Sequence, residues 1–310
     1  MAYLTKSKRG KKTYYYLAEN ITLADGTRKA LRKYIGAEEP TDTMLKMLIS
    51  EFEKEADEEK MKIHGYHYLA KEEIQEIDRI NSEFWKRYNK QNNIVQEQFD
   101  ENFAMAFVYN TNSIEGSTLT PKEVALLLAE NISPNKNLDD VLEAKAAQKA
   151  LYFVKDYKGE FNEQFLLTLH EIYFKETKPK IAGKYKTLEN YIRGSSFKLT
   201  PPELVPTDMK LYFQEYKKLE KELHPLELAA WCHWKIARIH PFQDGNGRIA
   251  RLTMNYILHK NNYAMIDIKT QDKKRYFKSM DRCNYNNNAR PLANRLIKRF
   301  TKQYQNALKN

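Results

Sequence analysis

The sequence predicts a mainly helical protein with a small β-structure at its N-terminus. Apolar residues recur at helical spacing through most of the chain after residue 40, whereas residues 1–36 alternate in short runs typical of strands. Hydrophobic residues make up 42% and aromatic residues 12% of the 310 residues, which is enough to bury a sizeable core. We therefore expect one large helical domain with small attachments.

The N-terminal segment 1–36 is expected to form a small basic β-meander. Turn signals at Gly10 and Gly26 separate three short strands. The segment carries nine Lys or Arg residues against Glu19 and Asp25, and so supplies +7 of the formal net charge of +11. Such a segment is either a solvated strand face or a contact surface for nucleic acid or an acidic partner, and both interpretations are open.

Helical periodicity begins after this segment. Residues 37–92 are expected to form a helical arm or linker, and residues 93–310 a single domain. Within the domain, Gly116 should end the first helix, and Thr120 with Glu123 should start the next through a capping box. Helices are expected over 43–62 and 71–87 in the arm, and over 138–157, 161–175, 207–223, 225–239, 247–261, 271–283 and 291–308 in the domain.

One segment of the domain departs from the helical pattern. Residues 181–206 have the distribution of Gly, Tyr and Ile that is typical of a β-hairpin. A hairpin in a helical domain would cover a site or offer an edge with which a peptide can pair.

The location of the protein is inferred from what the sequence lacks. Cys232 and Cys283 are too few for a disulfide framework and have no CxxC spacing. No signal peptide is recognised at the N-terminus, and no apolar run approaches the ~18 residues of a membrane helix. We expect a cytoplasmic protein that does not associate with a membrane.

A polar loop, HPFQDGNGRIAR at residues 240–251, lies between two strongly apolar helical segments. Its glycines and asparagine come where the second helix begins, and a helix N-terminus with glycine lets backbone N–H groups approach an anion. Arg248 and Arg251 are three residues apart, on one face of that helix, where two guanidinium groups could hold several phosphates. The loop therefore predicts a polyphosphate site.

Two further side chains of the loop predict chemistry at that site. Asp244 is the only carboxylate in the loop, and a single Asp beside phosphates is a typical ligand of Mg²⁺. His240 could take a proton from an incoming hydroxyl near neutral pH. These residue types do not indicate which phosphate is attacked.

The loop matches every position of the Fic (filamentation-induced-by-cAMP) signature HPFx[DE]GNGRxxR, and the resemblance extends over roughly residues 95–305, with a flap at 181–197. It implies a protein adenylyltransferase that moves AMP from ATP to a Ser, Thr or Tyr hydroxyl. The resemblance implies that His240 is the base, that Asp244 binds Mg²⁺, and that Gly245, Asn246 and Gly247 form an anion hole. It further implies that Arg248 contacts the α- and β-phosphates, that Arg251 contacts the γ-phosphate, and that Tyr276 and Asn284 contact adenine.

A second motif resembles the inhibitory pattern [ST]xxxE[GN] of the same family. TNSIEG, residues 111–116, places Thr111, Glu115 and Gly116 at the marked positions, on a helix expected over about 99–117. In the class with an N-terminal inhibitory helix, the glutamate pairs with the second arginine of the signature, here Arg251. The resemblance thus implies a resting enzyme in which ATP binds but does not react.

Other functions remain open from the sequence. The same site could remove AMP from a modified protein, with Glu115 orienting water, or could transfer UMP or phosphocholine. A nucleic-acid-binding regulator that uses residues 1–36 is an alternative of another class. We expect a target protein to pair with the flap at 181–197, and a homodimer is common in the family.

Overall fold

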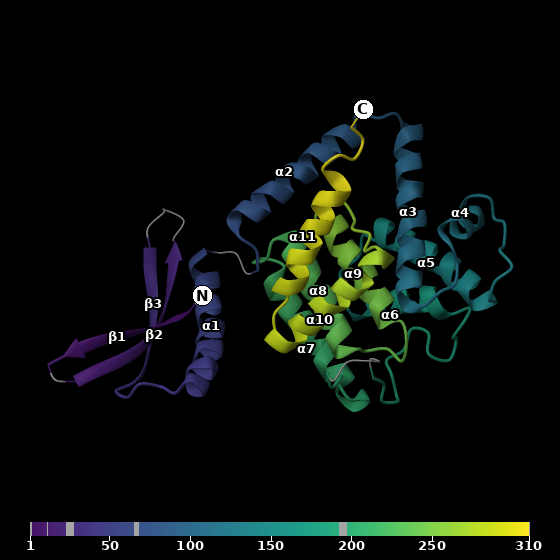
Figure 1. The fold of residues 1–310 in the computed structure, drawn as a ribbon. Coiled ribbons are helices and arrows are strands. Elements are labelled where there is room, and N and C mark those ends of the chain that lie inside the picture. Colours follow the sequence, from purple (N-terminus) through teal and green to yellow (C-terminus); the bar gives the residue numbers. More distant parts are fainter. Residues whose placement is uncertain (1, 11, 23–27, 65–67, 192–196, 310) are drawn as a thin grey trace. The chain divides into compact units, whose positions relative to one another are not determined.

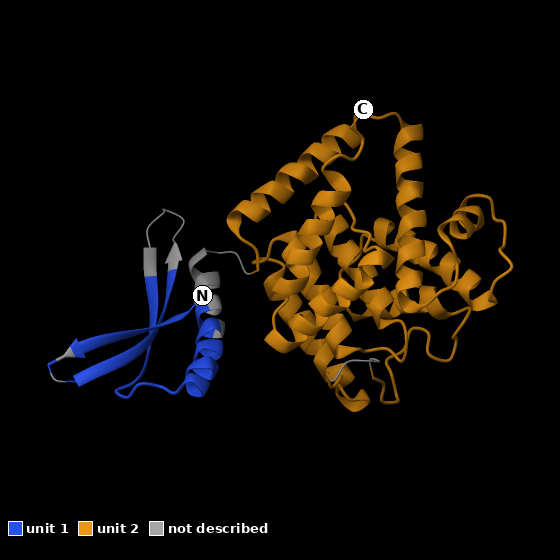
Figure 2. Cartoon of the chain, in the orientation of Figure 1, with its two compact units in different colours: residues 1–67 blue, residues 68–310 orange. Residues whose placement is uncertain are grey.

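The computed structural model describes the whole chain except residues 1, 11, 23–27, 65–67, 192–196 and 310. The chain forms two compact units, residues 1–67 and residues 68–310 (Figures 1 and 2). The two helices expected in the segment 37–92 therefore belong to different units: α1 (Asp42–His64) to the first and α2 (Lys71–Tyr88) to the second.

The first unit is the expected three-stranded meander with one helix added. Strands β1 (Tyr3–Arg9), β2 (Lys12–Thr22) and β3 (Arg28–Gly36) are antiparallel in the order β1-β2-β3. Helix α1 packs on one face of this sheet, because its apolar side chains meet those of the strands. The buried residues of this small core are Ala2, Leu17, Phe52 and Ala56.

The second unit is helical in its described residues, as expected. Helix α3 (Asn93–Glu115) ends at Gly116, which adopts φ 109° as the left-handed C-cap. Thr120 and Glu123 form the expected capping box of α4 (Pro121–Ala129). The remaining helices are α5 (Leu138–Asp156), α6 (Glu163–Phe174), α7 (Val205–Leu219), α8 (Pro225–Ile239), α9 (Asn246–Lys260), α10 (Lys273–Asn286) and α11 (Arg290–Tyr304), with short 3₁₀ turns η1 (Pro202–Leu204) and η2 (Thr270–Asp272).

Helices α8 and α9 pack against each other and form the centre of this unit (Figure 1). Most side chains of both helices are buried, including Trp231, whose ring stacks on Tyr212 of α7 at 5.2 Å. Helices buried on nearly every face cannot shift without breaking the core. The loop between α8 and α9 is therefore held rigidly at both ends. No helix within the described parts of the chain combines the length and apolar character needed to cross a membrane.

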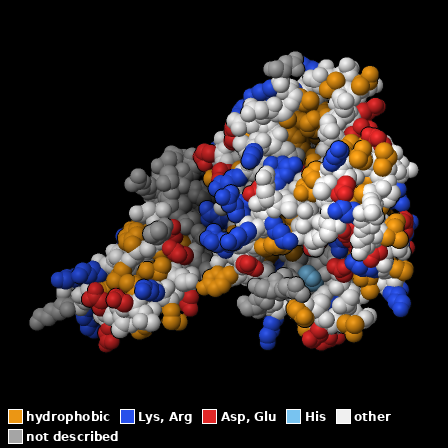
Figure 3. Space-filling model, turned by 45° about the vertical axis from the view of Figure 1, so that its right-hand side comes forward, with side chains coloured by type: hydrophobic (Ala, Val, Ile, Leu, Met, Phe, Trp, Pro, Cys, Tyr) orange, Lys and Arg blue, Asp and Glu red, His pale blue; other side chains and the backbone are white. Residues whose placement is uncertain are grey.

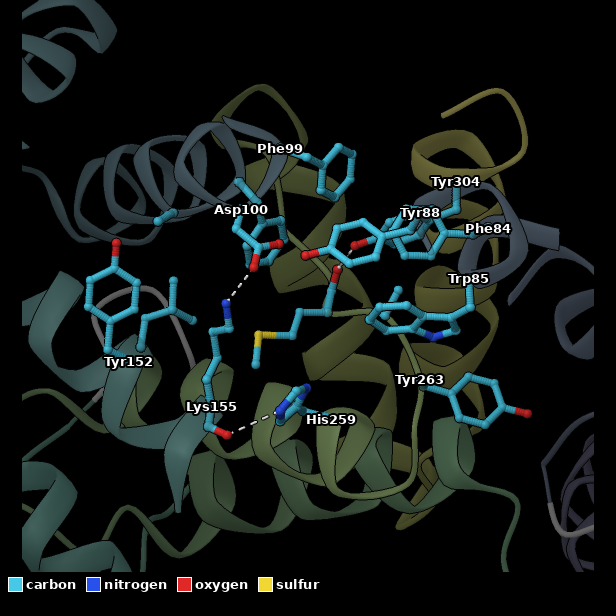
Figure 4. A pocket seen from close by; sticks show the side chains of 15 residues that line it. Phe84, Trp85, Tyr88, Phe99, Asp100, Tyr152, Lys155, His259, Tyr263 and Tyr304 are labelled. Carbon is cyan, nitrogen blue, oxygen red and sulfur yellow. Dashed lines mark hydrogen bonds and ion pairs between the residues drawn. The ribbon is translucent and has the colours of Figure 1, made fainter. Parts of the chain in front are cut away.

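Helix α3 is anchored near its N-terminal end by an aromatic cluster around a cavity of about 170 Å³ (Figure 4). Phe84 of α2 lies at the centre, with ring centroids 5.4 Å from Phe99 of α3 and 4.5 Å from Tyr304 of α11. Across the cavity, Lys155 of α5 donates a 2.7 Å hydrogen bond to Asp100 of α3. These contacts tie the N-terminal part of α3 to α2 and α5, and α2 in turn to α11.

The β-hairpin expected over 181–206 is wrong for the residues that the structure describes. Residues 181–191 and 197–201 form turns and irregular backbone and contain no strand, and residues 192–196 lie outside the described part. The segment pairs instead with the signature loop: Lys186 N–H donates to Pro241 O at 2.9 Å, and Asn190 Nδ2 donates to Phe242 O at 3.0 Å. The backbone N–H groups of Lys186 and Leu188, which donate to Pro241 O and Gln243 Oε1, are therefore not available for a β-ladder.

Candidate active site at the loop between α8 and α9

The loop of residues 240–245 is shaped by two left-handed residues and one asparagine. His240 caps α8 with φ 57°, and Gly245 adopts φ 80° just before α9. The Asn246 side chain accepts a 2.8 Å hydrogen bond from Phe242 N–H and donates a 2.7 Å bond to Phe242 O. Asn246, expected among the nucleotide-binding residues, thus uses its side chain to hold the loop. Its proposed part in the anion hole would rest on its backbone N–H, as a hydrogen-bond donor to the anion.

The two glycines of the loop are required by close approaches. A Cβ on Gly245 would lie 2.2 Å from the ring of Phe174, in addition to the strain of its positive φ. A Cβ on Gly247 would lie 2.5 Å from Glu115 Oε1. Gly247 therefore lets a carboxylate from α3 reach the N-terminus of α9, where backbone N–H groups and the helix dipole favour an anion.

His240 is neutral and holds its ring in one tautomer. Nδ1 lies 3.1 Å from Ala237 O, an acceptor, so the proton sits on Nδ1 and Nε2 carries the lone pair. Burial, reinforced by the charge of Lys186, lowers the pKa of His240 from 6.5 to about 4. The side chain can therefore accept a proton at Nε2 throughout the neutral range.

Arg251 is paired with Glu115, as expected from the two motifs. Its Nη2 donates to Glu115 Oε1 at 2.6 Å, and its Nε donates to Thr111 Oγ1 at 2.9 Å. The Arg251 side chain is 2% exposed and that of Glu115 is 32% exposed. Partial burial opposes ionisation of Glu115, but Arg251 and Arg248 outweigh it and lower the pKa of this carboxyl. The site thus holds an ionised carboxylate at the start of α9.

Two buried asparagines of α3, which the sequence did not single out, hold the inhibitory motif in place. Asn110 donates to Asp267 Oδ2 at 2.9 Å and accepts from Thr270 N–H at 2.9 Å. Asn112 accepts a 2.6 Å hydrogen bond from the Tyr173 hydroxyl. The last two turns of α3 are therefore bonded to the domain on both sides of Thr111.

A charge network around Asp244 includes two residues that sequence reasoning missed. Lys178 donates to Asp244 Oδ2 at 2.6 Å and to Glu143 Oε1 at 3.0 Å. Arg248 pairs with Glu143 and lies 3.5 Å from Asp244 Oδ1, with its guanidinium 4.7 Å from the Phe174 ring centroid. Partial burial opposes ionisation of Asp244, but Arg248 and Lys178 lower its pKa, so the carboxylate is charged. No motif links Lys178 and Glu143 to the loop, because they approach it only in the folded chain.

His170 anchors the loop from α6, beyond the core-packing role that the sequence predicts. Gly183 N–H donates to Nδ1 at 3.0 Å, so Nε2–H donates to Asp244 O at 3.1 Å. The His170 ring also stacks on Phe242 at 4.0 Å. Burial lowers the pKa of His170 to about 4, which keeps this bridging tautomer.

The two residues expected to contact adenine are engaged within the protein. The side chain of Tyr276 is buried, and its hydroxyl lies 2.7 Å from His233 Nε2. Asn284 Oδ1 accepts a 2.9 Å hydrogen bond from Trp234 Nε1. Both lie on α10, on the side that faces α8. Their role as adenine contacts remains a proposal.

Buried histidines of this site make the protein sensitive to acid. In the folded state the pKa is about 4 for His170 and about 3 for His233, against 6.5 for an ordinary histidine. A folded pKa that is depressed means that the unfolded chain binds more protons below 6.5, so stability is lost as the pH falls. We expect the free energy of unfolding to fall by about 1 kcal/mol per pH unit for each of these histidines between pH 6.5 and 4.5.

Urea titrations at pH 7.0, 6.0, 5.0 and 4.5 measure this loss. The H233Q variant should be less stable at pH 7 but should show a flatter dependence on pH than the unsubstituted protein. A free energy of unfolding that is constant over this window would contradict the assignment of neutral, buried histidines.

Comparison with known proteins supports the interpretation of residues 240–251 as a Fic signature. The family model described as Fic/DOC family matches residues 160–258, which include the whole signature loop. Curated relatives named "Protein adenylyltransferase Fic" include one from Nematostella vectensis, 29% identical over 188 residues and 57% of this chain, and one from Drosophila persimilis, 30% identical over 179 residues and 55% of this chain. The matched regions are only 43% and 34% of those proteins, so the chain spans less than half of their length.

Solved structures extend the similarity to most of the chain. A Fic domain containing signaling protein from Bacteroides thetaiotaomicron matches with a TM-score of 0.68 and 31% identity, over 75% of this chain and 95% of that one. Fic-1 (aa134–508) from C. elegans matches in fold, with a TM-score of 0.66 and 23% identity, over 76% of this chain and 69% of that one. The chain carries the signature loop and resembles the Bacteroides protein over nearly the full length of that protein. It therefore belongs to the Fic/DOC family.

Proposed function

We propose that the protein is a Mg²⁺-dependent protein adenylyltransferase that rests in an autoinhibited state. It transfers AMP from ATP to a Ser, Thr or Tyr hydroxyl of a target protein, an activity in line with the name of its curated relatives. One observation carries the proposal: an ionised carboxylate, Glu115, lies at the N-terminus of α9 beside Gly247 and paired with Arg251. A place that binds one anion through an arginine and a helix N-terminus is suited to phosphates.

The reaction uses the tautomer of His240. The target hydroxyl gives its proton to Nε2 of His240, and its oxygen forms a bond to the α-phosphorus of ATP. The bond from that phosphorus to the bridging oxygen breaks, and pyrophosphate leaves. The hydrogen bond from Nδ1–H to Ala237 O keeps Nε2 directed at the hydroxyl. Arg248 and the backbone N–H groups that start α9 stabilise charge on the phosphates.

The residues present fit a Mg²⁺ ion that is bound mainly by phosphates. Asp244 is ionised, and its side chain is 46% exposed. Among the described residues there is no cluster of three or more His, Cys, Asp or Glu that could hold a metal by itself. Mg²⁺ is commonly bound by one or two carboxylates plus substrate phosphates. Bound there, Mg²⁺ would neutralise phosphate charge. Lys178, which now bonds to Asp244, competes for the same carboxylate oxygen.

Autoinhibition follows from the occupation of Arg251. Two of its nitrogens already bond to α3: Nη2 to Glu115, and Nε to Thr111. A γ-phosphate that needed Arg251 would meet the negative charge of Glu115 at the same place. ATP would then bind without its α-phosphate in line with the target hydroxyl.

The target protein is proposed to contact the segment that precedes α7. Leu188 and Tyr191 are 67% and 88% exposed, although both are large apolar side chains. Their neighbours are bonded to the loop, because Leu188 N–H donates to Gln243 Oε1 at 3.2 Å and Asn190 donates to Phe242 O. Because this segment is bonded to the loop that begins at His240, a protein bound to Leu188 and Tyr191 would lie near that loop.

The position of the label in ATP tests the reaction type. The E115G variant, incubated with Mg²⁺ and ATP labelled at the α-phosphate, should label itself or a target protein more than the unsubstituted protein does, whereas ATP labelled at the γ-phosphate should leave no label. Label from the γ-phosphate alone would instead indicate a kinase. UTP and CDP-choline in parallel reactions test the alternative donors, and stronger labelling from either would replace AMP as the transferred group.

A further inference from the structure

The sheet of the N-terminal unit has two unlike faces. One face is covered by α1, whose Phe52 and Ala56 pack with Leu17 and with its neighbours across the sheet. Adjacent strands place Leu4, Leu17 and Lys33 in one row on this face, and Lys33 forms a 2.5 Å ion pair with Glu55 of α1. Because side chains alternate along a strand, every second residue of β1, β2 and β3 lies on the opposite face.

The opposite face, here called the open face, carries rows of tyrosine together with Thr5, Ala18 and Arg32. One row is Tyr3, Ala18 and Arg32, and the next is Thr5, Tyr16 and Tyr34. Tyr3 is 45% and Tyr34 is 54% exposed. The Tyr34 ring centroid lies 5.5 Å from that of Tyr16 and 6.1 Å from that of Tyr14, so the rings form one continuous aromatic surface.

The charge of the open face suits an anionic partner. Basic and acidic side chains both occur on the surface shown in Figure 3, so net charge alone marks no site. The open face is different, because its described residues include the exposed Arg32 and no carboxylate. By the same alternation, the exposed Lys12 lies on the open face, whereas Lys6, Lys8 and Glu19 lie on the α1 side, where Glu19 is 6% exposed. A polyanion can therefore approach the tyrosines without repulsion.

We propose that the open face binds single-stranded nucleic acid. Unpaired bases can stack on exposed tyrosine rings, while Arg32 and Lys12 contact the phosphates. A duplex hides its base faces, and an acidic protein would need the positive charge but not the rows of aromatic rings. The tyrosines therefore favour the single strand over both.

Fluorescence anisotropy with the full chain tests this inference. The probes are labelled (dT)₁₂, (rU)₁₂, a duplex of equal length and a poly-glutamate peptide, each titrated at low and at higher salt. We expect one or both single strands to bind at least 10-fold more tightly than the duplex or the peptide, with affinity that falls as salt rises. The two single strands distinguish RNA from DNA as the source.

Variants of one strand position separate stacking from charge. Y34A should weaken single-strand binding by about 5- to 150-fold, the loss expected for one stacked base, whereas Y34F should keep it. The matched control is Y15A, because Tyr15 lies on the α1 side, where its hydroxyl donates to Glu39. Circular dichroism checks that each variant folds.

The inference is overturned if no probe binds at low salt, if the duplex or the acidic peptide binds as well as the single strands, or if Y34A binds like the unsubstituted protein. AMP transfer by Y34A should equal that of the unsubstituted protein, since the open face is not part of the loop between α8 and α9. A failure of one proposal therefore does not imply a failure of the other.

Discussion

Replacing His240 by alanine is expected to lower the rate of AMP transfer by about 100- to 10,000-fold, the range typical of a lost general base. The reason is that Nε2 of His240 holds the basic lone pair of a neutral ring, whose pKa is lowered to about 4 mainly by burial. Transfer of label from α-labelled ATP, measured as an initial rate at pH 7, gives the ratio. The rate should also change little between pH 5.5 and pH 7.5, because His240 stays neutral over that range.

Two controls separate the lost base from a disturbed loop. His240 has φ 57°, which strains alanine but is tolerated by asparagine, so H240N keeps the backbone and removes the base. H259A removes a histidine from the far end of α9. We expect H240N to be as inactive as H240A and H259A to remain active. Activity of H240N close to that of the unsubstituted protein would rule out His240 as the base.

Removing the charge of Glu115 is expected to raise AMP transfer by about 5- to 150-fold, the range of typical coupling free energies between linked sites. E115G takes away the 2.6 Å ion pair and frees Arg251 for the γ-phosphate. E115Q keeps a side chain that can accept a hydrogen bond from Arg251, and should give an intermediate rate. Because a buried arginine loses its partner, each variant is expected to unfold at a lower temperature, so rates are compared per folded molecule.

The matched control for E115Q is E101Q, which removes an exposed carboxylate from the same helix without touching Arg251. E101Q should behave like the unsubstituted protein. Equal rates for all four proteins would contradict autoinhibition by Glu115. A different result, in which E115Q loses the ability to release AMP from a premodified target, would favour the reverse reaction, with Glu115 as the residue that orients water.

Much of the fold could be predicted because the helices and their ends depend on local sequence patterns. Helix boundaries followed apolar spacing and caps, and Gly116 and the capping box of Thr120 and Glu123 stand where the sequence placed them. The hairpin over 181–206 is the exception among the described residues. Its composition suits a strand, but hydrogen bonds to residues 241–243 replace the β-ladder, and such long-range partners leave no local signal.

Part of the candidate site could likewise be predicted from local sequence, and the rest depends on long-range contacts. His240, Asp244, Arg248 and Arg251 are close in sequence on one loop and one helix turn, so their spacing alone predicted a phosphate site, and that role stays a prediction. The TNSIEG motif added Glu115 through its resemblance to a known pattern. The tertiary structure showed that Arg251 meets this carboxylate, at 2.6 Å, and that its guanidinium also bonds to Thr111.

Tertiary structure alone also brought Lys178, Glu143 and His170 to the loop, from segments 60 or more residues away in the chain. It showed that the Asn246 side chain holds the loop rather than a ligand, and which face of the N-terminal sheet is left open by α1. Local sequence specifies backbone conformation and residue chemistry. The pairing of charges depends on how helices pack across the core, since packing sets the distances at which those charges interact.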